Sequence, residues 1–439
     1  MLRAIFSRKP FALISVFLSL LCCHTNAESS ALKTQVHSFD VFDTLLGRLH
    51  KDPLSVFRLV EKRYPFPGFT KLRTAAARAS NGTLEDTYRK FMAMNRLSLE
   101  ETAKLKAFEI ETEISNVFPI VSNLSKVQDG DLLVSDTYYN NEELSQILKK
   151  IGLDKKIHLF ITVSGKSKGH VWPKLTKNYE ILSHLGDNPR ADVSSPQKYG
   201  IQGVLCTKTH YTPIEQDVCK RGQTDLANLI RVLRLLNPYP EESVQGTAWK
   251  NQAQYNVPRL ILASLTLNAF CQQRNITSLL FSARGCCHFM KIFKKLFPNY
   301  TSTYFHTSQS MYRNPTPEFV HYVHSLYTPN TVIVEEHGSG AACQKFFTKH
   351  LSTFPNHTTL VRRSSSLPHL SEQFEHIPES LNIDSAGPLI LFDGTGPVHT
   401  PLEYTLEDIQ PAHKCIESCL SLLDEYEVVT ALSLLRGAS

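Results

Sequence analysis

Acidic, hydroxyl and ammonium side chains follow several apolar runs of this chain, and they are the residue types that nucleophilic chemistry needs. Asp40 ends the run 35–40, Ser135 lies near the end of the run 131–136, and Asp187 ends the run 184–187. Lys166 lies in a loop bounded by glycines. A carboxylate can attack an electrophile only if its negative charge is held beside the electrophile without repelling it. A divalent cation together with a lysine can provide this compensation.

The elements that must position these residues alternate between strands and helices. Apolar runs predict strands at 35–40, 131–136 and 157–163 and a strand end at 184–187, and helical periodicity predicts helices at 142–151 and 174–182. Such alternation is typical of parallel βαβ units, so we expect an α/β fold. Ligands of these sheets bind at the carboxyl ends of the strands, where the polar residues would meet.

Between the first two predicted strands the pattern is helical. Apolar residues recur at spacings of three and four from about residue 54 to residue 124, and Thr83-Leu-Glu-Asp resembles a helix start with an acidic first turn. We therefore predict an all-helical insertion over about 54–124.

A single aspartate after an apolar strand most often caps a helix or faces solvent in a turn. Here four segments occur in order: Phe39-Asp40-Val-Phe-Asp43-Thr44, Leu132-Leu-Val-Ser135-Asp136, Gly165-Lys166-Ser-Lys168-Gly169 and Gly186-Asp187 through Asp192. They resemble the four motifs of the haloacid-dehalogenase-like (HAD) hydrolase superfamily, especially the predicted hydrolases that begin Ser-Phe-Asp-x-Phe-Asp-Thr-Leu. The resemblance covers roughly residues 35–210 and implies a Rossmann-like parallel sheet whose helical insertion is a cap.

The resemblance also implies roles. Asp40 would be the nucleophile that forms an aspartyl intermediate, Ser135 would bind the transferred group, and Lys166 would neutralise charge, with Lys168 as the alternative lysine. The implied positions at the metal site are Asp40, Phe42, Asp187 and Asp192. Hard oxygen ligands beside a phosphate suit Mg2+. The implied activity is that of a Mg2+-dependent phosphatase, a hydrolase whose substrate is a phosphorylated small molecule.

Position 42 departs from the superfamily pattern. Phosphatases of this superfamily carry a second aspartate two residues after the nucleophile, as general acid and base; here that position is Phe42, and we expect Asp43 to point elsewhere. General acid–base catalysis contributes ~10²–10⁴-fold in rate. The chain would then hydrolyse substrates with good leaving groups, use another proton donor, or be a catalytically impaired protein that binds a phosphorylated ligand or partner.

A second α/β domain is predicted after a Pro-containing stretch near residue 240, so we divide the chain into 28–236 and 245–439. Three apolar runs there lead into Gly-bearing loops: 278–285, 331–340 and 388–396. The superfamily's relatives carry Arg-Asp-Gly where Arg284-Gly285 stands. Glu335 and Glu336 faintly resemble the diphosphate loop of phosphoribosyltransferases, with spacing one residue short. No histidine pair has metal-ligand spacing, so zinc is not expected.

Residues 1–27 have the basic, apolar and small-residue order of a secretory signal, which predicts export as a secreted or periplasmic protein, or into the endoplasmic reticulum lumen or outside the cell in a eukaryote. A retained anchor is the alternative. After signal removal the formal net charge is about +3, which is too weak to indicate nucleic-acid binding, and no stable membrane span is expected.

The eight remaining cysteines permit disulfides, although Cys415 and Cys419 could equally be buried thiols. Five Asn-x-Ser/Thr sequons would be glycosylated in a eukaryotic host: Asn81, Asn123, Asn275, Asn299 and Asn356. The stretch 362–370 is predicted to be an exposed loop.

Overall fold

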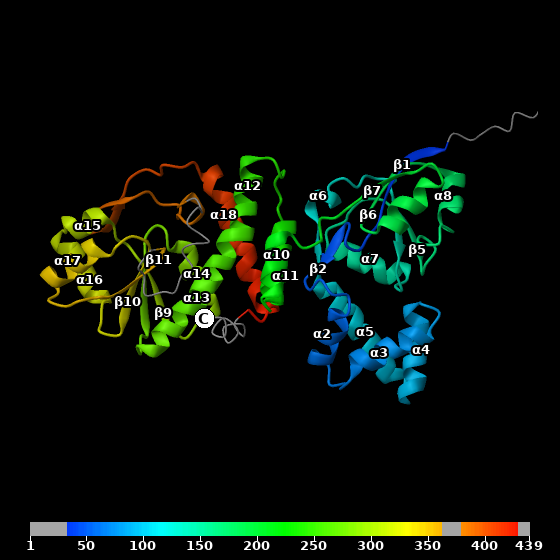
Figure 1. Cartoon of the computed structure of the whole chain (residues 1–439), viewed down its shortest axis with the longest axis horizontal. Coiled ribbons are helices and arrows are strands. Elements are labelled where there is room, and N and C mark those ends of the chain that lie inside the picture. The colour runs from blue at the N-terminus through cyan, green and yellow to red at the C-terminus, as the bar shows by residue number, and fades with distance from the viewer. Residues whose placement is uncertain (1–32, 362–378, 429–439) are drawn as a thin grey trace, which may run out of the picture.

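The computed structural model describes residues 33–361 and 379–428. In these residues the chain is an α/β protein with two parallel sheets, one in each half of the molecule (Figure 1). The predicted signal segment 1–27 and the predicted loop 362–370 lie outside the described residues.

The first sheet has five parallel strands in the order β5-β4-β1-β6-β7. The strands are β1 (Thr34–Phe39), β4 (Leu132–Asp136), β5 (His158–Thr162), β6 (Tyr179–Gly186) and β7 (Gln202–Leu205). The predicted strands at 35–40, 131–136 and 157–163 are confirmed. Because β1 lies between β4 and β6, the carboxyl ends of these three strands share one edge of the sheet.

The helices of this half are α7 (Asn141–Lys150), α8 (Trp172–Asn178) and the short α6 (Val121–Leu124) and α9 (Ser195–Gln197), with a π-helical turn at Pro189–Ser194. The predicted helix 142–151 is confirmed as α7. The predicted helix 174–182 is wrong in its second half, because it ends at Asn178 and strand β6 begins at Tyr179. Pairing with β1 over 179–185 fixes this segment as an inner strand, in which Ile181 and His184 are buried.

The predicted helical insertion contains α2 (Ser55–Arg63), α3 (Phe69–Ala79), α4 (Leu84–Asn95) and α5 (Leu99–Asn116). We call α2–α5 the helical segment. The chain enters and leaves it through an antiparallel pair, β2 (Leu46–Arg48) and β3 (Val117–Pro119). Inside it, Arg73 donates two hydrogen bonds of 2.8 Å to Glu109, and both side chains are buried. The apolar residues of the segment share one core with Phe39 and Leu133 of the first sheet, so the segment packs onto that sheet's domain above a short two-stranded base.

The second sheet has four parallel strands in the order β11-β10-β8-β9. They are β8 (Ser278–Ser282), β9 (Thr301–Phe305), β10 (Thr331–His337) and β11 (Asn356–Val361). The runs at 278 and 331 are thus strands of this sheet. The third run forms β12 (Leu389–Asp393), which pairs antiparallel with β13 (Gly396–His399) in a separate hairpin.

Helices accompany the second sheet and connect it to the first half. They are α10 (Pro213–Lys220), α11 (Thr224–Leu235), α12 (Val244–Asn251), α13 (Val257–Gln273), α14 (Cys287–Leu296), α15 (Gln309–Arg313), α16 (Pro317–Leu326), α17 (Ala341–His350) and α18 (Leu406–Leu422), with a π-helical turn at Gln252–Asn256 and 3-10 turns at Glu379–Leu381 and Leu423–Glu425. Residues of α11, α13 and α18 share one apolar core, which also contains Leu49, Phe118 and Ile120 of the first half. The apolar core is therefore continuous between the two halves.

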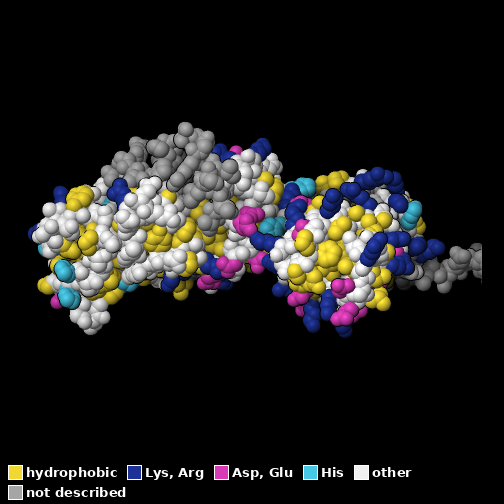
Figure 2. All heavy atoms as spheres, turned by 90° about the horizontal axis from the view of Figure 1, so that it is seen from below, with side chains coloured by type: hydrophobic (Ala, Val, Ile, Leu, Met, Phe, Trp, Pro, Cys, Tyr) yellow, Lys and Arg dark blue, Asp and Glu magenta, His cyan; other side chains and the backbone are white. Residues whose placement is uncertain are grey.

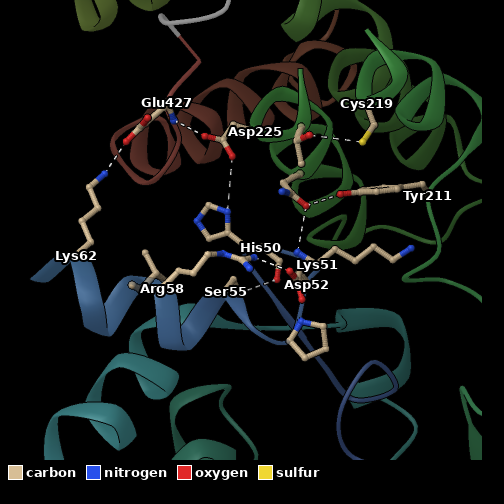
Figure 3. Close-up of a pocket in the computed structure, with 14 residues that line it drawn as sticks. His50, Lys51, Asp52, Ser55, Arg58, Lys62, Tyr211, Cys219, Asp225 and Glu427 are labelled. Atoms are coloured by element: carbon tan, nitrogen blue, oxygen red, sulfur yellow. Dashed lines mark hydrogen bonds and ion pairs between the residues drawn. The ribbon is translucent and has the colours of Figure 1, made fainter. Parts of the chain in front are cut away.

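A polar joint lies beside this shared core. Seen from below, the molecule narrows between its halves, and acidic, basic and histidine side chains meet there (Figure 2). A cavity of about 750 Å³ at the joint lies between the start of the helical segment and α10–α11 (Figure 3). Lys62 pairs with Glu427 at 2.6 Å, and His50 lies 3.8 Å from Asp225. Lys62 lies in α2 and His50 just before it, so the pairs connect the start of the helical segment to the C-terminal Glu427 and to α11.

Buried hydrogen bonds add to the joint. The Tyr426 hydroxyl donates to the backbone oxygen of Leu49 at 3.0 Å, and Arg231 of α11 donates to the same oxygen at 3.3 Å. The eight cysteines at 206–419 are free thiols, and Cys415 and Cys419 are buried in the shared core. Among the described residues, we find no helix with the length and apolar character to cross a membrane.

Candidate active site

The carboxyl edge of the first sheet brings the predicted residues together. Asp40 follows β1 directly, Ser135 is buried at the end of β4, and Lys166 lies in the loop after β5. Asp187 follows β6, and Asp192 lies in the π-helical turn behind it. Ligand oxygens of Asp40, Asp187 and Asp192 all lie within 4.8 Å of one another. Side chains from segments about 150 residues apart in the sequence therefore form one acidic group.

Lys166 is the cation of this group. Its buried ammonium donates to Asp40, to Asp192 at 2.8 Å and to the backbone oxygen of Val134 at 3.2 Å. Burial lowers the pKa of Lys166, but the charges of Asp40 and Asp192 outweigh it and raise the pKa above its usual value. Lys166 is therefore charged. Lys168, the alternative lysine, is exposed.

The loop that carries Lys166 is held by Asp136, for which the sequence suggested no role. Its carboxylate accepts hydrogen bonds from the backbone N–H of Lys166 at 3.0 Å and of Ser167 at 3.1 Å, and from the Thr162 hydroxyl. The Lys166 carbonyl in turn accepts from the Ser195 hydroxyl at 3.1 Å. These bonds fix the loop backbone, so the lysine enters the site from a rigid support. The only sequence signal for Asp136 is its place beside Ser135 at the same strand end.

Two of the carboxylates have opposite electrostatic surroundings. Burial and the charge of Asp192 raise the pKa of Asp40 to about 6, although Lys166 acts against them. Burial also acts to raise the pKa of Asp192, but a hydrogen bond from His184 and the charge of Lys166 lower it to about 2. Asp192 is therefore the permanent anion that Lys166 faces, whereas the charge on Asp40 depends on pH near neutrality.

His184, also unpredicted, orients Asp192. Burial lowers its pKa to about 4, so the ring is neutral, and its Nε2 donates to Asp192 Oδ1 at 3.2 Å. Its Nδ1 then accepts from the Ser38 hydroxyl at 2.8 Å. The other oxygen of Asp192 accepts from the backbone N–H of Asn188 at 2.8 Å. Asp192 is thus fully hydrogen-bonded by its surroundings, which favours a supporting role over a direct ligand role.

Asp187 is the carboxylate that the protein leaves without a partner. It is half-buried, and no described residue makes a hydrogen bond or ion pair with it. Burial and the charges of Asp40, Asp43 and Asp192 raise its pKa to about 7. With Lys166 as the nearby cation, the group has excess negative charge, so its residues fit a divalent cation.

The side chain at position 42 cannot act as a general acid, because it is a phenylalanine. The Phe42 ring lies under the Arg48 guanidinium, 4.5 Å from it, and stacks on Tyr139 at 6.2 Å, so only its backbone oxygen could bind a metal. Asp43 adopts a left-handed backbone with φ of 56°, which is uncommon for a residue other than glycine. The charge of Asp43 contributes to the raised pKa of Asp187.

Hydrogen bonds behind Asp40 fix the turn that follows it. The Thr44 hydroxyl donates to Asp40 at 3.3 Å, and the Asn123 amide donates to the Thr44 backbone oxygen at 2.8 Å. Asn123 is one of the five sequon asparagines, yet it is buried, so it supports the site and is closed to glycosylation in the folded chain.

A second group of potential metal ligands lies in the other half: Cys287, His288 and His413. Cys287 donates to the Asn382 backbone oxygen at 3.3 Å, and His413 Nε2 pairs with the Ile383 backbone oxygen at 2.9 Å. Because two of these three ligands already have partners within the chain, we assign no metal to this group.

Models of protein families give no match to the chain, and a search of curated proteins finds no sequence similar to it.

Proposed function

We propose that the chain is a Mg2+-dependent phosphohydrolase that works through an aspartyl intermediate at Asp40. One observation carries the proposal: the buried carboxylate of Asp40, at the end of the central strand, contacts a charged lysine and shares with Asp187 and Asp192 a group of ligand oxygens within 4.8 Å of one another. The four segments that resemble the HAD-like motifs supply exactly these side chains.

Bound Mg2+ would be held by Asp40, Asp187 and the backbone oxygen of Phe42, with Asp192 behind them, and would neutralise the charge of a phosphate. The chain's own residues account for the remaining steps. A carboxylate oxygen of Asp40 forms a bond to phosphorus as the bond from phosphorus to the leaving oxygen breaks. Lys166 and the Ser135 hydroxyl stabilise the transferred group. Water then attacks phosphorus as the bond from phosphorus to the Asp40 oxygen breaks and the water gives a proton to the deprotonated Asp43, which releases phosphate and restores Asp40.

The leaving oxygen needs a proton, and Asp43 is the group we propose as its donor. Phe42 carries no ionisable group, whereas Asp43 follows it in a backbone conformation that turns the chain back, and its charge acts on Asp187. The helical segment begins a few residues later, and we propose that it serves as the cap that encloses a phosphorylated small molecule.

The second candidate is a protein that binds a phosphorylated ligand without turnover. It is favoured by the Arg48 guanidinium over Phe42, which fills the usual acid–base position with a stable apolar and cationic pair. Arg48 is itself tied to Glu113 at 2.8 Å. In this case the acidic group and Lys166 would retain metal and phosphate binding.

Phosphate release from a panel of phosphorylated sugars and nucleotides separates these candidates. We expect wild type to release phosphate and Asp40→Asn to be inactive, with Asp154→Asn, a change of an exposed aspartate, as the matched control. Equal release by wild type and Asp40→Asn would refute the aspartyl mechanism. If neither releases phosphate while beryllium fluoride with Mg2+ raises the melting temperature of wild type and not of Asp40→Asn, the binding protein is the better description.

A further inference from the structure

The second sheet has a polar cavity of its own at its carboxyl edge. It has a volume of about 290 Å³ and lies where β8, β9 and β10 end. The residues that the argument uses are Ser282, Arg284, Thr307, Tyr312, Glu335 and Glu336. None of them belongs to the site at Asp40, which lies on the other sheet, so this cavity needs its own explanation.

A buried hydroxyl in this cavity lacks a hydrogen bond. Ser282 is 6% exposed, and its hydroxyl has no partner in the described structure. Thr307 is 4% exposed, and its hydroxyl lies beside the buried Tyr312 hydroxyl, which also lies beside Cys343. Buried polar groups are normally paired, and an unpaired one destabilises the fold. The Ser282 hydroxyl and Nη1 of Arg284 therefore remain for a ligand, and the Thr307 and Tyr312 hydroxyls pair at most with each other or with Cys343.

The charges around the cavity balance one another. Glu336 accepts from Arg259 at 3.0 Å, and Glu335 lies 3.1 Å from His357. Arg284 lies 3.6 Å from the exposed Glu403, and its Nη1 is buried without a partner. A free anion would meet two glutamates, and a free cation would meet Arg284. The lining therefore favours a neutral ligand with many hydrogen-bonding groups.

The cavity also requires close backbone approach at one point. A side chain at Gly285 would place its Cβ 2.1 Å from a carboxylate oxygen of Glu336, so only glycine fits here without displacing this carboxylate. That same oxygen is 3.5 Å from His337 Nδ1, whereas the other carboxylate oxygen of Glu336 is used by Arg259 and Asn382. One face of the carboxylate thus remains available to accept hydrogen bonds from a ligand.

We propose that this cavity binds a neutral sugar, as a free monosaccharide or as one unit of a glycan. Sugar hydroxyls both donate and accept hydrogen bonds. Different hydroxyls of one sugar can therefore donate to Glu335 or Glu336, accept from Arg284, and pair with the Ser282 and Thr307 hydroxyls. The volume is at the lower end of small-molecule sites, which suits one sugar unit. The proposal is independent of the phosphohydrolase activity, because it uses no residue of the Asp40 site.

Saturation-transfer NMR with unmodified hexoses and pentoses, and with inorganic phosphate as a separate probe, tests the proposal on the full chain. We expect a monosaccharide to bind, and Ser282→Ala and Thr307→Val to weaken its affinity by roughly 2- to 10-fold each, the effect of one lost hydrogen bond. Ser302→Ala and Thr359→Val are matched controls, because their hydroxyls are also unpaired but lie outside the cavity lining. These controls should bind the sugar as wild type does.

Thermal unfolding of each variant tests whether weaker sugar binding is caused by a loss of folding. Because Ser282→Ala removes a buried unpaired hydroxyl, its melting temperature without sugar should equal or exceed that of wild type. The proposal is overturned if no monosaccharide binds, if phosphate alone binds, or if the cavity variants bind sugar as tightly as their controls. Repeating the titration in Asp40→Asn keeps this result separate from the fate of the phosphohydrolase proposal.

Discussion

Replacing Asp187 by asparagine should make the metal-free protein more stable at alkaline pH. Burial and the charges of Asp40, Asp43 and Asp192 raise the pKa of Asp187 from 3.8 to about 7. The folded chain therefore keeps this proton over a pH range in which the unfolded chain has released it. The free energy of unfolding falls as pH rises from about 4 to about 7, and the full penalty is present above that range.

The size of this loss of stability follows from the shift of the Asp187 pKa. At ~1.4 kcal/mol for each pH unit, a rise from 3.8 to about 7 corresponds to ~4 kcal/mol. Since Asp187 is only half-buried, solvent screening reduces this, and we expect ~2 kcal/mol. Asparagine carries no charge, so Asp187→Asn should unfold ~2 °C higher than wild type at a pH of about 8 without metal, because the unfolding entropy of a 439-residue chain is ~0.9 kcal/mol/K. At a pH of about 4 the difference should vanish.

Mg2+ should reverse the order of the two proteins. A cation that binds the native state at about 100 times its dissociation constant adds ~2.7 kcal/mol, and Asp187→Asn should lose most of this gain. Thermal unfolding followed by circular dichroism, with EDTA or with Mg2+ at both pH values, measures each term, and Asp154→Asn controls for the loss of one negative charge. A lower melting temperature for Asp187→Asn with EDTA at alkaline pH, or equal stabilisation of both proteins by Mg2+, would refute the reasoning.

Three further outcomes follow from the same contacts. Lys166→Met should abolish phosphate release and destabilise the fold by ~3 kcal/mol because it leaves buried carboxylates without a cation, whereas Lys168→Met, two residues away and exposed, should leave both unchanged in the same release and unfolding assays. Asp43→Asn should slow hydrolysis of alkyl phosphates by ~10²–10⁴-fold and of aryl phosphates with good leaving groups far less, and equal slowing of the two in steady-state kinetics would exclude Asp43 as the proton donor. Arg73→Met should lower the free energy of unfolding by ~3–5 kcal/mol in urea titrations, because it leaves Glu109 charged and buried, and a loss below ~1 kcal/mol would show that this pair contributes little.

The strands of the first sheet could be predicted because their apolar runs are short and end in polar residues. The same reasoning predicted that Asp40, Lys166 and Asp187 would meet, since parallel strands share a carboxyl edge. It extended the helix after 174 too far, because helical spacing of apolar residues continues beyond Asn178 while pairing with β1 decides the conformation. Local pattern thus predicts an element's existence better than its end.

The supporting residues could not be predicted, because their roles depend on contacts between distant segments. In the sequence, His184 is one more residue of a strand, and only the fold brings Asp192 against it. Asn123 is part of a sequon in the sequence, and only the fold brings the Thr44 backbone oxygen to its amide. The left-handed backbone of Asp43, with φ of 56°, could likewise not be read from the spacing of its residues. Hydrogen-bonding partners and backbone turns of this kind are properties of the folded chain.

The bond between Tyr426 and Leu49 joins residues 377 positions apart. At ~5–20 residues per second, a ribosome needs roughly 20–75 s to make the chain between them. During that interval the first half emerges with one end of its apolar surface uncovered, and the last helices complete that surface only late in synthesis. A nascent chain of this protein is thus exposed to chaperones or to premature association for most of its production, and a stop codon before Leu406 would remove α18 and leave part of that surface uncovered permanently.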